Sequence, residues 1–317
     1  MQVTFEKLLR LAYKKVAEKQ GEEEAAKLLL MELSGLDPHA FFMAMKDEVS
    51  PELETLFLNS LSRYLDDKIP VQHVIGHSYF FGHKLYVNEH VLIPRPETEQ
   101  LVEHVLYFYD AYFENQEINL LDLGTGSGCI GLTLAKEESH LHVTASDISE
   151  DALVVARKNK EALGVTADFV LSDLFQNIRG KFSILVSNPP YIPDSEVVDE
   201  IVQKEPSVAL YGGSLGVDFY DKILKNAKPF LEEKALIAFE HGYQQKDVIA
   251  SFVKTHYPDA IILQMKDLAG KDRFTFVGLN GVLAKEYKNN IIRRSSLSFW
   301  KSWFFSLHTI KCSIKWN

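Results

Sequence analysis

The stretch LLDLGTGSG at residues 120–128, together with the helical pattern of residues 129–136, decides the fold. An apolar run leads into a turn with glycines at 124, 126 and 128, and a helix follows. Such glycines let the backbone bend sharply and approach a ligand, and the helix N-terminus offers free N–H groups. The spacing G-x-G-x-G differs from the G-x-G-x-x-G of dinucleotide folds. The stretch therefore predicts a strand, a turn and a helix around a nucleotide-like cofactor.

An acidic residue ends the next predicted strand. Asp147 follows the apolar run 141–146, nineteen positions after Gly128. At this place a carboxylate accepts hydrogen bonds from ribose hydroxyls, which predicts an adenosine-containing cofactor. The alternative is that Asp147 caps the helix beginning near Glu150, a role that Ser149 fits equally well.

Strand patterns alternate with helical patterns along most of the chain. The seven predicted strands are 118–123, 141–146, 167–172, 182–187, 235–240, 260–265 and 273–279. This alternation predicts an α/β fold with a doubly wound, mostly parallel sheet. Ligands bind such sheets beyond the carboxyl ends of the strands. The glycine turn, Asp147, Asp173 and Asn188 each follow a predicted strand, so we expect them to cluster at one edge.

The motif Asn188-Pro189-Pro190-Tyr191 directly follows the apolar run 182–187. Two prolines fix φ and remove two backbone donors, which leaves the local carbonyls free to accept hydrogen bonds and holds the asparagine in one orientation. This arrangement suits an incoming NH2 group and predicts alkylation of a planar amide or amine. The motif alone is equally compatible with a proline-rich turn that ends a strand.

Four segments differ in pattern along the chain. Apolar residues recur at helical spacing before residue 75, and these stripes indicate a helical core and not a ligand site. Aromatic and β-branched residues punctuated by Gly76, Gly82 and Asn88 then predict a short hairpin. The predicted segments are a helical domain at 1–75, a hairpin linker at 76–92, the α/β domain at 93–280 and a tail at 281–317.

Composition limits the class of protein. At about 100–200 residues per domain, 317 residues predict two domains, and 46% hydrophobic residues suffice for a core. We expect a soluble cytoplasmic protein, because the sequence contains neither a signal-peptide pattern nor a run of about 20 apolar residues. Only Cys129 and Cys312 are present, without a metal-binding pattern, so we expect reduced thiols and no metal.

Charge is distributed unevenly between the tail and the rest of the chain. The whole chain has a formal charge of −10. Residues 281–317 contain seven Lys or Arg against Glu286 alone, a formal +6, which leaves −16 for residues 1–280. Because binding to a phosphate backbone depends on Lys and Arg that displace counterions, this balance argues against direct nucleic-acid binding.

Three motifs together carry a family resemblance. They are LIPRPETE at 92–99, DLGTGSGC at 122–129 and SNPPYI at 187–192, and two lesser matches are Pro70-Val71-Gln72 with Gly76 and Glu205-Pro206 with Ala209-Leu210. The chain resembles the release-factor glutamine methyltransferases, which are class I enzymes dependent on S-adenosylmethionine. The resemblance runs from the helical part to about residue 280. It implies a seven-stranded, Rossmann-like methyltransferase sheet behind a small all-helical N-terminal domain.

The resemblance implies cofactor-binding roles. The turn wraps the methionine end of S-adenosylmethionine, Asp147 holds the ribose and Asp173 accepts from the adenine amino group. Phe175 covers the adenine, although a plain core aromatic and a cover by Leu174 are alternatives. The implied cofactor residues are Gly124, Thr125, Gly126, Ser127, Gly128, Asp147, Asp173, Phe175 and Asn188. Arg95 and Glu97 either line the site or pair with each other.

The resemblance also implies how the acceptor is held. The Asn188 side-chain oxygen and the Pro189 carbonyl each accept one N–H of the substrate amide, Pro190 completes the turn, and Tyr191 packs against the substrate side chain. An amide nitrogen is a poor nucleophile, so orienting its lone pair toward the methyl group is the useful work, and orientation supplies up to about 7–11 kcal/mol of a barrier. We assign no general base and expect Asn188, Pro189 and Tyr191 to be the catalytic residues.

The implied substrate is the glutamine of a Gly-Gly-Gln tripeptide in a peptide chain release factor, which the helical domain helps to bind. NPPY-like turns also serve enzymes that methylate exocyclic amines of DNA or RNA, and this is the alternative function. A third hypothesis is a non-catalytic binding protein. The acidic body argues against the second hypothesis, and the intact cofactor motifs argue against the third. A monomer is the default expectation.

The tail of residues 281–317 does not fit the family pattern. It contains Trp300, Trp303 and Trp316 among basic and apolar residues. It is either an interfacial or RNA-contacting segment or an extension without a selected fold. We favour the extension, which predicts that deleting 281–317 leaves activity intact.

Overall fold

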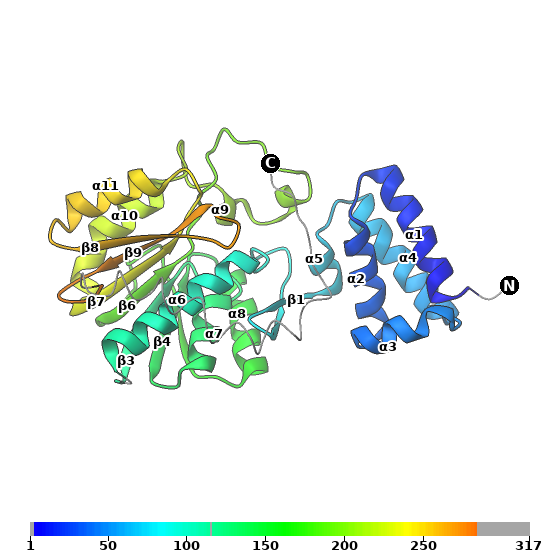
Figure 1. Cartoon of the computed structure of the whole chain (residues 1–317), viewed down its shortest axis with the longest axis horizontal. Coiled ribbons are helices and arrows are strands. Elements are labelled where there is room, and N and C mark those ends of the chain that lie inside the picture. Colours follow the sequence, from blue (N-terminus) through cyan, green and yellow to red (C-terminus); the bar gives the residue numbers. More distant parts are fainter. Residues whose placement is uncertain (1–2, 115, 284–317) are drawn as a thin grey trace. The chain divides into compact units, whose positions relative to one another are not determined.

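The computed structural model describes residues 3–114 and 116–283, and the predictions for Trp300, Trp303, Trp316 and Cys312 lie outside these residues. The described chain forms two compact units that divide between Ile75 and Gly76 (Figure 1). The first is all-helical and the second contains every strand.

The first unit consists of short helices with well-defined ends. They are α1 (Phe5–Lys19), α2 (Glu23–Ser34), α3 (Pro38–Met43), the 3-10 helix η1 (Ala44–Lys46), α4 (Pro51–Leu65) and α5 (Val71–Ile75). The Ser50 hydroxyl accepts from the Leu53 amide at the start of α4, and Pro51 occupies the first helical position. Since proline needs no hydrogen-bond donor there, Ser-Pro marks this helix start in the sequence.

Apolar stripes hold the first unit together. Leu8 on α1, Leu29 and Leu30 on α2 and Leu61 on α4 are all almost completely buried. Helices α1, α2 and α4 pack against one another through these faces. The predicted helical core is therefore present, and burial of each such side chain contributes about 1.5–3 kcal/mol.

A hairpin opens the second unit. Strands β1 (His77–Phe80) and β2 (His83–Tyr86) pair antiparallel. The backbone of Tyr86 exchanges two hydrogen bonds with the Asn159 side chain of helix α8 (Glu150–Leu163), at 2.7 and 2.9 Å. The hairpin predicted as a linker at 76–92 is thus fixed to the α/β unit.

A seven-stranded sheet forms the centre of the second unit. Its strands are β3 (Ile118–Leu123), β4 (Leu141–Asp147), β5 (Ala167–Leu171), β6 (Phe182–Ser187), β7 (Leu231–Glu240), β8 (Ile261–Lys266) and β9 (Asp272–Gly278). The order is β5-β4-β3-β6-β7-β9-β8, with β9 antiparallel to both neighbours and all other pairs parallel. The prediction of a doubly wound, mostly parallel sheet is confirmed.

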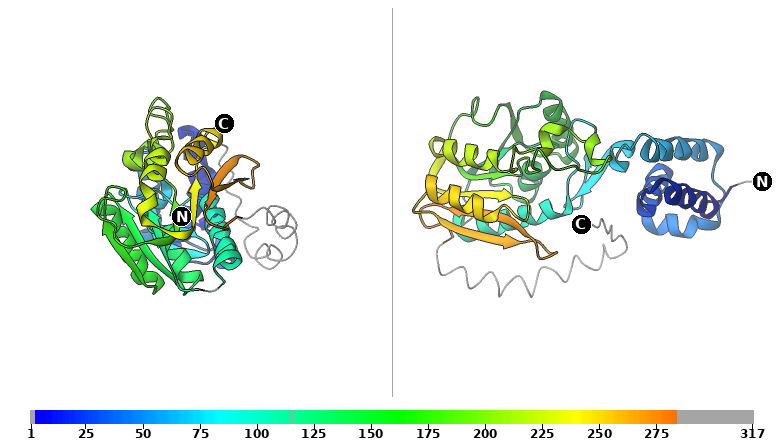
Figure 2. Two further views of the ribbon diagram at one scale, coloured as in Figure 1. Left: turned by 90° about the vertical axis from the view of Figure 1, so that its left-hand side faces the viewer. Right: turned by 90° about the horizontal axis from the view of Figure 1, so that it is seen from above.

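Helices cover both faces of this sheet (Figures 1 and 2). Helices α6 (Pro96–Phe113), α7 (Cys129–Glu137) and α8 pack in succession over one face, where Phe108 of α6 meets Phe276 of β9. Helices α10 (Asp218–Ala227) and α11 (Lys246–His256) join the core on the other face. Three short helices complete the unit: η2 (Val202–Lys204), α9 (Ser207–Leu210) and η3 (Lys228–Phe230).

The strand order places the site. The chain begins at the centre of the sheet with β3, proceeds outward to β4 and β5, and then returns to β6 on the other side of β3. The carboxyl ends of β3 and β6 therefore lie side by side where the winding reverses, which is where ligands bind in open α/β sheets.

Candidate active site

A pocket opens at the carboxyl edge of the sheet. It is lined by the loops after β3, β4, β5 and β6, by the segment before α6 and by residues near α9 and α10. Nine predicted site residues line it: Gly124, Thr125, Gly126, Ser127, Asp147, Asp173, Asn188, Pro189 and Pro190. These nine residues therefore lie together at one edge of the sheet.

The glycine turn forms one wall through its backbone. The amides of Gly124 and Thr125 both donate to the carbonyl of Ser146, at 2.8 and 2.9 Å, which ties the turn to β4. Gly124 and Gly126 have φ of 77° and 56°, and no atom lies within 4 Å of where a Cβ would stand. The positive φ explains the glycines, because other residues are strained there. The open space leaves this backbone accessible to a ligand.

Two polar side chains beneath the turn have an oxygen atom without a partner. Asp122 Oδ2 accepts from the Thr125 hydroxyl at 2.6 Å and from the Gly131 amide at 2.9 Å, whereas its Oδ1 and the Ser127 Oγ are buried with no partner among the described residues. Burial raises the pKa of Asp122 to about 6. Buried polar atoms are normally paired, so these two indicate a polar ligand at the turn.

Asp147 is held by the backbone around it. Its Oδ2 accepts from the Gly126 amide at 2.8 Å and its Oδ1 from the Ser149 amide at 2.9 Å. The Ser149 hydroxyl, and not Asp147, caps α8 by accepting from the Ala152 amide. A carboxylate has about four acceptor positions, so Asp147 retains capacity for hydroxyl donors in the pocket. Burial raises the pKa of this carboxyl.

The segment after β5 divides its side chains between the pocket and the core. Asp173 and Leu174 line the pocket. Phe175 does not: it is buried in the core and stacks on Phe230 with ring centroids 4.9 Å apart. This places Leu174, the alternative considered for the adenine cover, at the pocket wall and gives Phe175 the role of a core aromatic.

Two further predicted residues stand behind the pocket wall. Gly128 begins α7, and a Cβ there would meet Leu132 at 2.6 Å, so its role is close packing. The Tyr191 side chain packs against the core cluster that contains Tyr220 and Phe239. Burial raises the pKa of Tyr191 to about 12, which keeps this phenol neutral.

The Tyr191 backbone is anchored by Gln245. The Gln245 Nε2 donates to the carbonyls of Tyr191, Leu215 and Gly216 at 2.7, 3.2 and 3.1 Å. A Cβ at Gly216 would collide with the Tyr191 carbonyl, so a glycine is required for this approach. These contacts fix the end of the NPPY turn, and the sequence motifs did not reveal Gln245.

A buried ion pair joins two other segments of the pocket. The Arg95 guanidinium donates to Glu205 Oε1, and Glu205 Oε2 accepts from the Ile93 amide at 2.9 Å. Arg95 also lines the pocket. Arg95 was expected either to line the site or to pair with Glu97. It lines the pocket and also forms an ion pair, but its partner is Glu205.

Glu240 is a buried acid that the sequence motifs missed. It is the last residue of β7 and is 1% exposed, and the polar side chains of Thr98 and Asn188 next to it act to lower its pKa. Burial raises the pKa of Glu240 to about 7, and Glu97 adds to the shift. The signal in the sequence was the acid ending the apolar run ALIAFE, since the carboxyl edge is where ligands bind.

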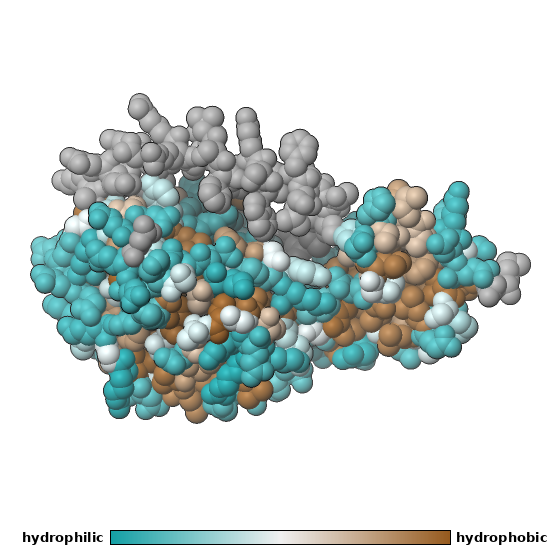
Figure 3. All heavy atoms as spheres, turned by 90° about the horizontal axis from the view of Figure 1, so that it is seen from below, coloured by the Kyte–Doolittle hydropathy of each residue, from teal (hydrophilic) through white to brown (hydrophobic). Residues whose placement is uncertain are grey.

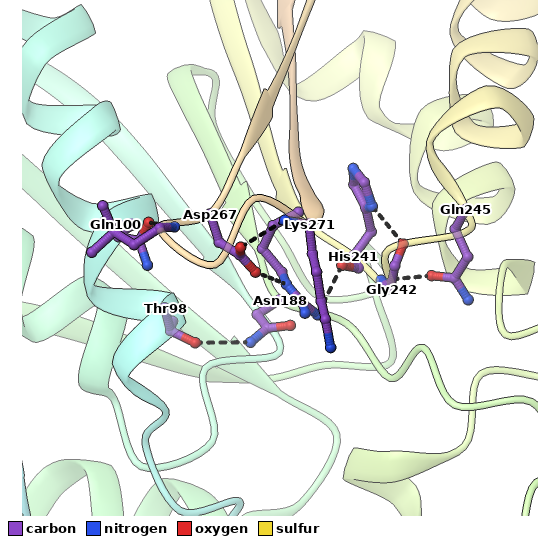
Figure 4. A network of polar contacts seen from close by, with 10 residues as sticks. Thr98, Gln100, Asn188, His241, Gly242, Gln245, Asp267 and Lys271 are labelled. Carbon is purple, nitrogen blue, oxygen red and sulfur yellow. Dashed lines mark hydrogen bonds and ion pairs between the residues drawn. The ribbon is translucent and has the colours of Figure 1, made fainter. Parts of the chain in front are cut away.

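A polar network surrounds the NPPY turn (Figure 4). The Asn188 Nδ2 donates to the Thr98 hydroxyl at 3.3 Å. Gln100, two positions along α6, accepts from the Leu268 amide in the β8–β9 turn at 3.0 Å. In that turn Asp267 accepts from the Lys271 amide and from Arg273 Nε. Helix α6 therefore contacts both the NPPY turn and the β8–β9 turn.

The described residues contain neither a metal-binding cluster nor a membrane-spanning helix. No group of three or more His, Cys, Asp or Glu in residues 3–114 and 116–283 has a metal-binding arrangement. No helix in the same ranges is long and apolar enough to cross a membrane.

The fold and the pocket define a methyltransferase. Residues 106–235 match the family model described as methyltransferase small domain, and residues 7–76 match the PrmC N-terminal domain. The release factor glutamine methyltransferase of Streptococcus pneumoniae is 38% identical over 265 residues, covering 82% of this chain and 93% of that protein. That of Bacillus anthracis is 35% identical over 274 residues, covering 84% and 96%. The chain belongs to the release factor glutamine methyltransferase family.

A solved structure shares the fold of the chain. The hMettl16 catalytic domain, determined in complex with the MAT2A 3′UTR hairpin 6, matches with a TM-score of 0.50 and 12% identity, covering 74% of this chain and 84% of that one. At this identity the similarity concerns the fold alone.

Proposed function

We propose that this enzyme transfers a methyl group from S-adenosylmethionine to the side-chain amide nitrogen of the glutamine in the Gly-Gly-Gln tripeptide of a peptide chain release factor. The observation that carries the proposal is one pocket lined both by the glycine turn and by Asn188, Pro189 and Pro190. Cofactor and acceptor thus meet in a single space. Family membership supports the protein substrate.

The cofactor-binding half fits S-adenosylmethionine by its donors and acceptors. The open backbone at Gly124 and Gly126 and the unpaired Ser127 Oγ suit the polar amino-acid end. Asp147 accepts from the ribose hydroxyls, Asp173 from the adenine amino group, and Leu174 covers the ring. When bound, the cofactor supplies an electrophilic methyl group on a sulfonium with a neutral leaving group.

The NPPY turn orients the acceptor amide. Asn188 Oδ1 and the Pro189 carbonyl each accept one N–H of the substrate NH2, which fixes the plane of the amide. Because the prolines and Gln245 hold this turn rigidly, the nitrogen lone pair is directed at the methyl group with little reorganisation. Tyr191 supports the turn from the core, so we assign it a positioning role in place of direct substrate contact.

The helical unit offers a surface for the protein substrate. Leu11, Phe42, Met43 and Leu56 are 43%, 74%, 68% and 49% exposed. Figure 3 shows apolar surface over this unit. Exposed apolar patches mark interaction sites, so we propose that this unit helps to bind the release factor. Because the proposed substrate is a translation termination factor, we propose that the enzyme is cytoplasmic. A monomer is the simplest proposal for its oligomeric state.

Labelled methyl transfer tests the proposed function. The enzyme is incubated with labelled S-adenosylmethionine and a release factor, a Gln→Ala version of its Gly-Gly-Gln tripeptide, DNA or RNA. Label on the intact release factor alone supports the proposal. Label on nucleic acid would establish the alternative acceptor, an exocyclic amine, and cofactor binding without label on any acceptor would favour the non-catalytic hypothesis.

A further inference from the structure

The acid at the end of β7 has no role in the reaction described so far. Glu240 is buried, and its Oε2 has no hydrogen-bond partner among the described residues. The hydrogen-bonding side chains of Thr98 at the start of α6 and of Asn188 after β6 lie next to its carboxylate and favour its charged form. A buried carboxylate without full pairing is costly, and such groups are often found at functional sites.

The hydrogen bond between Asn188 and Thr98 has a direction. Asn188 Nδ2 donates to the Thr98 hydroxyl, so the Thr98 proton is available for another acceptor. Glu240 as a carboxylate is such an acceptor, and it can only accept. The carboxylate therefore attracts both the Thr98 proton and the Asn188 NH2. The Asn188 oxygen is the atom left for the pocket.

We propose that Glu240 is a positioning residue that sets the orientation of the Asn188 amide through Thr98, so that oxygen and not nitrogen faces the acceptor. The inference rests on the proposed function, because only an NH2 acceptor requires an oxygen at this position. An Asn188 amide turned by 180° would present its own NH2 to the NH2 of the substrate. Two donors facing each other would exclude the productive pose.

The charged groups around Glu240 determine when it is a carboxylate. Arg273 of β9 stabilises its charge, whereas Glu97 of α6 opposes it. The charge of Glu240 also acts on the phenols of Tyr191 and Tyr220 and on the thiol of Cys129, and all three are neutral at physiological pH because their pKa values are raised. Burial raises the pKa of Glu240 to about 7. Below that pH the protonated acid can donate, and the orientation of Asn188 is lost.

Substitution of the acid by its amide tests the proposal. Glu240→Gln keeps the shape but removes the negative charge that attracts the Thr98 proton and the Asn188 NH2, so we expect kcat to fall at least tenfold while the Kd for S-adenosylmethionine changes less than threefold. In the wild type, kcat should fall as the pH drops through about 7, and this acid limb should be absent from Glu240→Gln. Unchanged kcat, or the same acid limb in the variant, would overturn the proposal.

The Thr98 relay has a matched pair of variants. Thr98→Val removes the hydroxyl with little change in volume, and Thr98→Ser retains it. We expect kcat to fall in the valine variant and to stay near the wild-type value in the serine variant. Equal losses in both would indicate packing in place of a hydrogen-bond relay.

A double variant separates orientation from stability. In Glu240→Gln/Asn188→Asp, the Gln NH2 donates to one Asp oxygen and the other oxygen faces the substrate. We expect this variant to have at least tenfold higher kcat than Glu240→Gln. A purely structural role for Glu240 predicts additive losses instead, so a double variant no better than the product of the single effects would contradict the proposal.

The side-chain amide of Asn188 provides a readout that needs no turnover. Its ¹⁵N and ¹H resonances should titrate with the Glu240 pKa in the wild type and should not do so in Glu240→Gln. A wild-type resonance that is insensitive to pH between 5 and 9 would refute the coupling. This result is obtained even if the release factor is not labelled, so failure of the proposed function and failure of the Glu240 inference are distinguishable.

Discussion

The two halves of the pocket are stabilised in different ways. On the β3–β4 side, the glycine turn and Asp147 are held mainly by backbone amides from within 22 residues, such as the Gly126 amide on Asp147. On the β6–β7 side, the NPPY turn is held by side chains from distant segments, among them Thr98 of α6 and Gln245 before α11.

The different stabilisation of the two halves should separate cofactor binding from methyl transfer. A backbone-built half depends on few side chains, so it tolerates substitution except where a side chain meets the cofactor directly. A half built from side chains loses its geometry when any member of the network is removed. We therefore expect substitutions in the first half to change cofactor affinity and substitutions in the second half to change kcat.

Asn188→Ala should have the largest effect. It removes one of two acceptors for the substrate NH2, and loss of a single positioned hydrogen-bonding group at the reacting centre costs about 10²–10³ in kcat. The Kd for S-adenosylmethionine should change little. Asn226→Ala, at an exposed asparagine on α10, is the matched control. Unaltered turnover in Asn188→Ala would contradict the assignment of methyl transfer to the NPPY half of the pocket.

Asp147→Ala should show the opposite pattern. Loss of hydrogen bonds from a charged acceptor to two ribose hydroxyls costs about 1.5–3 kcal/mol, which corresponds to roughly 10–100-fold in Kd for the cofactor. At saturating cofactor, kcat should stay within threefold of the wild-type value. Titration calorimetry measures the affinity, with the exposed Asp151→Ala on α8 as control. A large loss of kcat at saturation would show that the two halves are not separable.

Gln245→Ala tests the support of the NPPY turn. The substitution leaves the carbonyls of Tyr191, Leu215 and Gly216 without their common donor. We expect the free energy of unfolding to fall by about 1–3 kcal/mol and kcat to fall with no change in cofactor Kd. Chemical denaturation and kinetics measure the two effects, and the exposed neighbour Gln244→Ala is the control. A change in cofactor affinity alone would contradict the assignment.

Truncations of the tail should have the smallest effect. Val282 and Leu283 are 0% and 4% exposed, so a cut at residue 281 removes two buried side chains. We expect a chain of residues 1–283 to retain activity within twofold, and a chain of residues 1–280 to be less stable by about 2–4 kcal/mol. Loss of methyl transfer in the chain of residues 1–283 would assign a function to the tail.

Locality explains which parts of the molecule could be predicted. The seven strands and the glycine turn were predictable because periodicity and turn chemistry act over a few residues. Phe175 was assigned to the adenine because an aromatic after β5 fits either the pocket or the core, and only tertiary packing on Phe230 distinguishes them. Gln245 and the Arg95–Glu205 pair were missed because the partners are 54 and 110 residues apart, and Glu240 was missed because only the sheet brings it next to Thr98 and Asn188.

The position of β9 in the sheet has a consequence for folding. Strand β9, the last strand among the described residues, inserts between β7 and β8 and contributes Arg273. The Leu268 amide in the preceding turn donates to Gln100 across 168 residues. Contacts of such separation form late, whereas α1, α2, α4 and α5 of the helical unit pack against one another within residues 5–75. A nascent chain can thus fold its helical unit early, but it remains without a complete acceptor site until its final strand leaves the ribosome. Until then the edges of β7 and β8 are unpaired, which makes incomplete chains prone to aggregate.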